Sequence, residues 1–166
     1  MINILAEFKL TRVGFDKSIK INDVFDHQND SWIIRAISSS RVKNRRVKGF
    51  GGKYGIQRDV IVVDVVAQKV GTINVMNLSA KNSSMTWTIN TAKVNTYDGD
   101  NFINIGESVI CEDGRTYIVT QINEIGYKFV DIKIDFEALS VTELPERETI
   151  KLSTKQKITE LGWQVI

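Results

Sequence analysis

The sequence contains one cysteine, one histidine and one proline among its 166 residues. A single cysteine excludes an internal disulfide framework, and one cysteine with one histidine provides too few ligands for most zinc sites. A chain of this length buries roughly 68–70% of its unfolded surface and needs neither kind of crosslink to hold a core. We therefore expect no metal and no cofactor.

Long apolar runs are also missing. No stretch approaches the roughly 20 residues that a membrane helix requires, and residues 1–10 carry Glu7 and Lys9 where a signal peptide would be apolar. With 42% hydrophobic and 25% charged residues, the composition is typical of a globular protein. The sequence predicts a soluble domain, made in the cytoplasm, with no membrane contact.

No pattern of catalytic residues is visible. His27 lies in an aspartate-rich segment, residues 23–30, which a polar turn between two strands explains. Cys111 follows Ile110 on an expected strand, where a small buried side chain is the ordinary interpretation. No nucleophile motif surrounds the serines. The sequence therefore predicts a protein that is not an enzyme.

Alternation of apolar and polar residues, the period of a β-strand, dominates the chain. Residues 2–10, 31–37 and 85–89 alternate in this way, and residues 71–78 do so more weakly. The β-branched run at residues 60–66 is dense enough for a strand that is buried on both faces. The pattern predicts a mainly β fold, an antiparallel barrel or sandwich.

The second half of the chain carries the strongest turn signal. Asp113 and Gly114 can both adopt positive φ, so they predict a two-residue type I′ hairpin. A second connection, at residues 123–127 and containing Gly126, leads into another alternating stretch. Residues 107–136 are therefore expected to form a three-stranded meander.

The expected domain division is a β domain over residues 1–140 and a C-terminal extension over residues 141–166. Ser153 begins a capping-box pattern and Gly162 provides a stop signal, so a short helix is expected at about residues 154–161. A charged extended tail is the alternative for the same segment.

The apolar side chains near the C-terminus need a partner, because such a patch exposed to water reduces solubility. Two interpretations are open. The tail folds back as a closing strand of its own sheet, or it docks on another subunit, which the hinge-like Gly162 favours. The candidate docking residues are Trp163, Val165 and Ile166.

Charge is unevenly distributed along the chain. Residues 41–58 contain seven basic residues and no acidic one, which leaves 15 basic against 20 acidic residues elsewhere. Because this segment also contains four glycines, we expect a long basic loop, a mobile arm that contacts protein or nucleic acid. A solvated hairpin tip without a partner is the alternative. The candidate binding residues are Arg41, Lys43, Arg45, Arg46, Lys48, Phe50, Lys53, Tyr54 and Arg58.

Residues 106–122 contain a strand, a tight glycine turn and an aromatic-containing strand, followed later by Lys133 and Ile134. This stretch resembles the closing half of phage head–tail adaptor (connector or stopper) proteins. The resemblance implies a small β-barrel that acts as a structural subunit of a phage neck, tail or head–tail connector. It also implies a homo-oligomeric ring, other virion proteins as partners, and a location in the virion after synthesis in the host cytoplasm.

An OB-like module that binds single-stranded nucleic acid is the alternative interpretation. In that case the basic loop would follow the phosphates, while Phe50, Tyr54 and Trp32 stack on bases.

Overall fold

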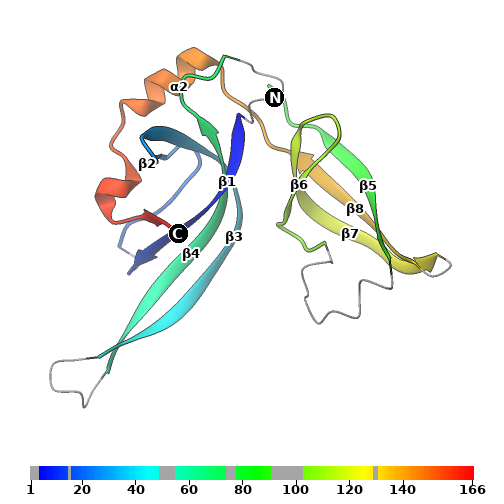
Figure 1. The fold of residues 1–166 in the computed structure, drawn as a ribbon, viewed down its shortest axis with the longest axis horizontal. Helices are drawn as coiled ribbons and strands as arrows, with labels where there is room; N and C mark the ends of the chain where they lie inside the picture. The colour runs from blue at the N-terminus through cyan, green and yellow to red at the C-terminus, as the bar shows by residue number, and fades with distance from the viewer. Residues whose placement is uncertain (1–3, 15, 49–54, 74–77, 91–102, 129–130) are drawn as a thin grey trace. The chain divides into compact units, whose positions relative to one another are not determined.

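The computed structural model describes residues 4–14, 16–48, 55–73, 78–90, 103–128 and 131–166. Strands account for 57% of the residues, and the antiparallel sheets form a near-closed barrel and a half-barrel (Figure 1). The predicted mainly β class, with a short helix near the C-terminus, is confirmed.

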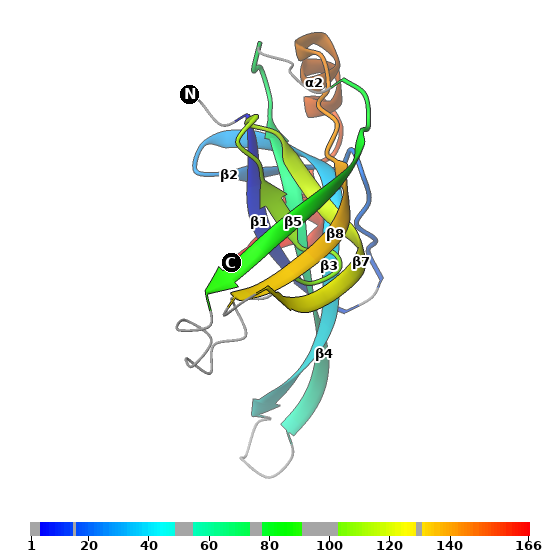
Figure 2. The same cartoon turned by 90° about the vertical axis from the view of Figure 1, so that its right-hand side faces the viewer.

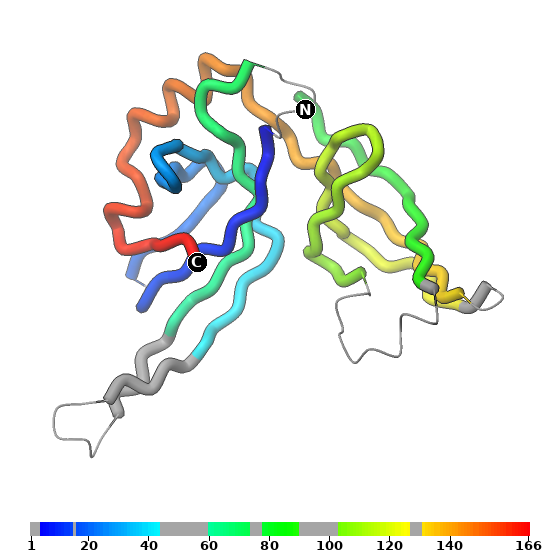
Figure 3. Tube along the Cα trace, in the orientation of Figure 1, coloured from blue at the N-terminus to red at the C-terminus, as the bar shows by residue number. Residues whose placement is uncertain are grey.

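The chain divides into two compact units, one of which is inserted into the other. The first unit comprises Met1–Val75 and Glu143–Ile166, and the second comprises Met76–Thr142. Figure 3 shows the blue N-terminal and red C-terminal segments together in the first unit. The expected division into residues 1–140 and 141–166 does not coincide with these units, because the C-terminal segment completes the core of the first one.

The first unit contains a five-stranded antiparallel sheet in the order β2-β3-β4-β1-β9. Its strands are β1 (Leu5–Val13), β2 (Val24–His27), β3 (Asp30–Lys48), β4 (Gly55–Lys69) and β9 (Gln164–Val165). The expected strands at residues 31–37 and 60–66 are confirmed as parts of β3 and β4, and residues 5–10 of the stretch at 2–10 belong to β1. Residue 4 precedes β1, and residues 2 and 3 lie outside the described residues. β3 and β4 extend well beyond the ranges expected for them.

β4 is buried on both faces, as its β-branched run predicts. Val63 and Val65 belong to the barrel core, whereas Val62 and Val66 alternate onto the other face, and each is at most 2% exposed. The prediction holds because neighbouring segments cover both sides of this central strand.

Gln68 is fully buried near the end of β4 and holds the segment that follows the second unit. Its side-chain amide donates to the carbonyl oxygen of Leu144 at 2.8 Å and accepts from the backbone N–H of Leu144 at 2.7 Å. Both bonds are needed, since an unpaired buried amide would cost roughly 1–3 kcal/mol. The pair attaches the returning chain to the first unit.

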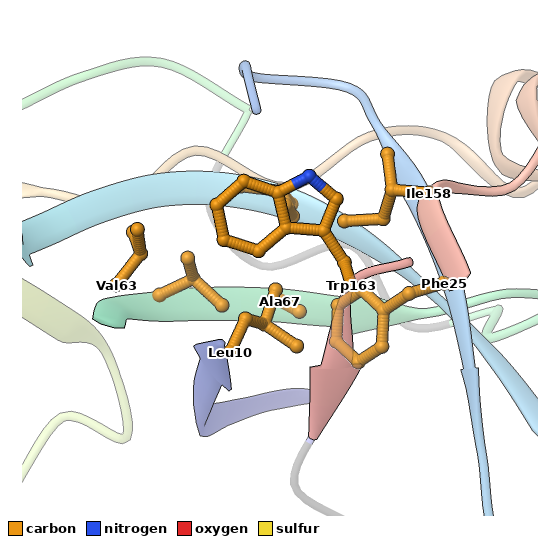
Figure 4. Close-up of a cluster of buried hydrophobic side chains, with 8 residues drawn as sticks. Leu10, Phe25, Val63, Ala67, Ile158 and Trp163 are labelled. Atoms are coloured by element: carbon orange, nitrogen blue, oxygen red, sulfur yellow. The ribbon is translucent and has the colours of Figure 1, made fainter. Parts of the chain in front are cut away.

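Trp163 occupies the core of the first unit and is 1% exposed. Figure 4 shows its indole among side chains from separate strands, including Leu10 of β1 and Phe25 of β2. β9 then pairs with β1, with Val165 opposite Leu10, and the Ile166 N–H donates to the Lys9 carbonyl at 2.9 Å.

The C-terminal segment is thus a closing strand of its own barrel. Trp163 and Val165 pack within the first unit. The interpretation in which they dock on another subunit is therefore wrong. Ile166 is 64% exposed. Gly162, with φ of 94°, turns the chain into this closing strand rather than acting as a hinge to a neighbour.

The C-terminal helix lies earlier than expected. α2 spans Glu146–Ser153 and begins directly after Pro145, whose fixed φ suits a helix start. Residues 154–161 instead hold a turn followed by the 3₁₀-helix η2 (Ile158–Leu161). Ser153 is the last residue of a helix, not the cap before one, so the proline was the better signal.

The second unit contains a four-stranded antiparallel sheet in the order β5-β8-β7-β6. Its strands are β5 (Asn82–Asn90), β6 (Ser108–Ile110), β7 (Thr116–Lys128) and β8 (Asp131–Ser140). The predicted meander is confirmed as β6-β7-β8, and the strand expected at residues 85–89 is part of β5. The strand expected from the weaker alternation at residues 71–78 is not found at residues 71–73 and 78. Residues 74–77 lie outside the described residues.

The turns of the two sheets differ from expectation. The Gly114 N–H donates to the Cys111 carbonyl and the Cys111 N–H to the Arg115 carbonyl, with positive φ at Gly114 (76°). This is a three-residue loop with a left-handed glycine, not a type I′ turn. The type I′ pattern, positive φ at both central residues, occurs instead at Gln28 and Asn29 between β2 and β3.

The expected connection at residues 123–127 is wrong, since β7 runs through it to Lys128. Its pairing with β8 shifts register between Val119 and Gln121 and again between Ile122 and Glu124. These irregularities bend the strand without ending it.

We expect Trp163→Ala to lower the free energy of unfolding of the first unit by about 3–5 kcal/mol, because it leaves a cavity between strands. Urea unfolding followed by circular dichroism measures the loss. Ile166→Ala, at a mostly exposed position, is the control and should change it by less than about 0.5 kcal/mol. Equal effects of the two substitutions would contradict the closing role of Trp163.

Gly114→Val is expected to destabilise the second unit by about 1–3 kcal/mol, because a β-branched side chain is placed at positive φ. Thermal unfolding provides the measurement. Gly126→Ala is a suitable control, since the Cβ would meet only the Glu124 carboxylate at 3.9 Å and the position has no positive φ. An unchanged melting temperature for Gly114→Val would argue against the left-handed turn.

Candidate functional site

The basic segment of the sequence lies mostly on two paired strands. β3 and β4 pair continuously out to Lys48 opposite Gly55, apart from two register shifts near the start of β3. β1 accompanies β4 only as far as Val60. Residues 43–48 and 55–60, the β3–β4 ribbon, are therefore two strands wide in the part of the chain that the structure describes (Figure 1).

This arrangement corrects the expectation of a long basic loop. The β-branched residues on both strands favour pairing, with Val42 opposite Ile61 and Val47 opposite Ile56. The candidate residues that lie on strands are Arg41, Lys43, Arg45, Arg46, Lys48 and Arg58. Phe50, Lys53 and Tyr54 lie outside the described residues.

The β3–β4 ribbon concentrates positive charge. It carries five basic residues and one acidic residue, Asp59. Arg45 and Arg58 occupy directly opposed register positions. Like charges at opposed positions of an antiparallel pair oppose the pairing.

Asp64 lies at the base of the ribbon and connects three strands. Its carboxylate accepts hydrogen bonds from the Ser39 hydroxyl and from Arg41 at 2.9 Å, and lies 3.8 Å from the Lys9 ammonium. Burial raises the pKa of this carboxyl, but the Ser39 and Arg41 hydrogen bonds outweigh it and the net pKa is lowered. Arg41, a candidate binding residue, thus has a structural partner.

The role of Asp64 was not predicted from the sequence. The available signal was a single acidic residue within the apolar run at residues 60–66. A charge in an otherwise apolar strand needs compensating partners, and the partners come from β1 and β3.

His27 and its acidic neighbours serve the fold. His27 ends β2, with its ring edge-on to Phe8 at 5.4 Å between centroids. Asp26 accepts hydrogen bonds from Ser31 at 2.6 Å and from Lys157 at 2.7 Å, and both lower the pKa of its carboxyl. The expected polar turn over residues 23–30 is limited to Gln28 and Asn29, because Val24–His27 form the strand β2. Asp26 also ties β2 to the C-terminal segment.

Cys111 lies in a setting that suppresses thiolate formation. Burial raises the pKa of the thiol, and the carboxylates of Asp113 and Glu112 raise it further. Its Sγ lies 3.5 Å from the Met85 Sδ. Reactive cysteines need the opposite environment, a positive one, so Cys111 acts as a packing residue between β5 and the β6–β7 hairpin.

Trp32 belongs to the core of the first unit. Its ring packs edge-on against Phe8 at 4.7 Å between centroids and lies against the buried cluster around Trp163. It is therefore not the exposed base-stacking residue that the nucleic-acid interpretation assigned. Trp87 of β5, 44% exposed, is the indole with an open face.

The described residues hold no group of three or more histidine, cysteine or carboxylate side chains arranged to bind a metal ion. Within the same ranges, no helix is long and apolar enough to cross a membrane.

No protein-family model matches the chain, and neither a curated protein nor a solved structure matches it.

We expect the stabilising effect of Asp64 to depend on pH. Its pKa is lower in the folded protein, so the stabilisation is present above the ordinary carboxyl value of about 3.9 and is lost as the pH falls through the folded value. Asp64→Asn should lower stability near neutral pH and flatten the acid loss. Urea unfolding between about pH 7 and about pH 3 tests this, and parallel profiles would contradict it.

Proposed function

We propose that the protein is a non-enzymatic structural subunit of a symmetric assembly, and that the β3–β4 ribbon binds an acidic surface of a neighbouring subunit. The observation that carries the proposal is the placement of five basic residues on a ribbon that no third described strand accompanies. Paired strands are ordered before binding, so association costs less conformational entropy than it would for a loop.

Charge complementarity favours a second copy of the chain as the neighbour. Outside residues 41–58 the chain has 15 basic and 20 acidic residues, so the body is acidic where the ribbon is basic. A contact between the ribbon of one copy and the body of the next is heterologous, and such contacts close into rings when the rotation permits.

The resemblance of residues 106–122 to head–tail adaptors supports a phage particle as the location of this assembly. In that setting the protein is a neck, tail or connector component that is made in the host cytoplasm and binds other virion proteins. The hairpin that carries the resemblance is β6–β7, in the second unit.

Single-stranded nucleic acid is the second candidate partner. The opposed register positions of Arg45 and Arg58 favour it, because an anionic backbone would offset the repulsion that like charges bring to a strand pair. The core position of Trp32 weakens this alternative by removing one of its three stacking residues.

The ribbon is tested by a triple variant, Arg45→Ala with Arg46→Ala and Lys48→Ala. Light scattering after size exclusion should show that the wild type assembles beyond a dimer and that this variant does not. The matched control removes three exposed cations elsewhere in the first unit, Lys17→Ala, Lys151→Ala and Lys155→Ala. We expect the control to assemble normally. Equal assembly of both triple variants would overturn the proposal.

Adding single-stranded oligothymidylate to the same samples separates the two partners. Assembly without nucleic acid supports the structural subunit. A monomer or dimer that binds the oligonucleotide with an affinity falling steeply with salt supports the alternative instead.

A further inference from the structure

Within the described part of the chain, β5 has an open edge that lacks the protection found on other open strands. It stands at the end of its sheet, and β8 is its only partner strand among the residues that the structure describes (Figure 2). Other strands also have stretches without a neighbour among the described residues. Beyond its pairing with β2, β3 carries basic residues and two shifts in its register with β4. Beyond its pairing with β6, β7 carries Glu124 and two shifts in its register with β8.

Charges and bulges on an open edge prevent pairing with other chains. β5 has neither. Its nine residues, Asn82–Asn90, include no charged residue, proline or glycine, and its register with β8 has no shift. A long, regular and uncharged edge of this kind is suited to receive another strand.

The backbone groups on the open edge can be identified. The Ser140 N–H donates to the Lys81 carbonyl at 2.9 Å, which makes Lys81 and Ser140 a hydrogen-bonded pair. In an antiparallel ladder, bonded and non-bonded pairs alternate. The next residues of β5 that direct their N–H and C=O groups away from β8 are therefore the even-numbered ones. The central three are Ser84, Thr86 and Thr88.

We propose that β5 pairs antiparallel with β5 of a second copy, across a two-fold axis at Thr86. The two sheets then become one continuous sheet. In this register Ser84 lies opposite the partner's Thr88, and Met85 lies opposite the partner's Trp87. The inference concerns the second unit and does not depend on what the β3–β4 ribbon binds.

The sequence of β5 complements itself in this register. A charge at the axis would meet its own copy, and none is present. Threonine and serine form favourable cross-strand pairs, and a methionine sulfur next to an indole ring is a favourable contact. Trp87, whose side chain is 44% exposed in the single chain, gains that contact.

The test compares Thr86→Pro with Thr86→Ala. Both remove the hydrogen bond from the Thr86 hydroxyl to Asp135 at 2.7 Å, but only proline removes the N–H on the open edge. Light scattering of the β3–β4 ribbon triple variant should give twice the 18.8 kDa of one chain. In that background, Thr86→Pro should raise the dimer dissociation constant at least about tenfold, which is about 1.4 kcal/mol. Thr86→Ala should stay dimeric.

Amide hydrogen exchange of the unmodified chain tests the same register without a substitution, in case proline disturbs the strand. The amides of Ser84, Thr86 and Thr88 should exchange more slowly as protein concentration rises. Those of Met85 and Trp87 point toward β8 and serve as internal controls that are protected at every concentration. A chain that stays monomeric, or edge amides that exchange fast at every concentration, would overturn the proposal.

Discussion

The burial of Trp163 is the contact on which the rest of the first unit depends. β1, β2 and β3 each contribute one buried side chain to the cluster around this indole, and β4 contributes three. The strands near the N-terminus therefore need a segment from the other end of the sequence. Gln68 holds that segment through Leu144, Asp26 holds it through Lys157, and β9 pairs it with β1.

The two units present different kinds of surface. The first carries a basic ribbon, where charge discourages unspecific strand pairing and would attract the acidic partner proposed for it. The second has, among the described residues, an uncharged edge strand, and the pairing proposed for it would use the backbone as the recognition element. The contact proposed for the ribbon would weaken with salt and the one proposed for β5 would not, so the two contacts could form independently.

Sequence patterns predicted the elements that depend on local periodicity. Val62, Val63, Val65 and Val66 follow one another on a strand covered on both sides, and a continuous β-branched run is the ordinary sign of such a strand. The turn at Asp113 and Gly114 was predicted in position but not in type, and the turn expected at residues 123–127 does not exist. Gln28 and Asn29 both have positive φ although neither is glycine. Asp113 and Gly114 belong to a three-residue loop, which is longer than the two-residue turn expected there.

The remaining errors come from contacts between residues far apart in the sequence. In the sequence, Trp163 follows a glycine and looks like part of a free apolar tail. Its place in the core becomes visible only in the fold, where side chains of β1, β2, β3 and β4 surround it. Arg41 looks like a binding residue until β3 is placed beside Asp64. Periodicity reports which face a residue takes within its own element, and it carries no information on which distant segment covers that face.

The insertion of the second unit has a consequence for folding during synthesis. All strands of the second unit leave the ribosome before η2 and β9, so its half-barrel can form while the first barrel still lacks its central side chain. The first unit has to wait, partly assembled, until Trp163 emerges. A chaperone that binds exposed apolar strands would therefore find its target in β1 to β4, and would be released when the returning segment displaces it.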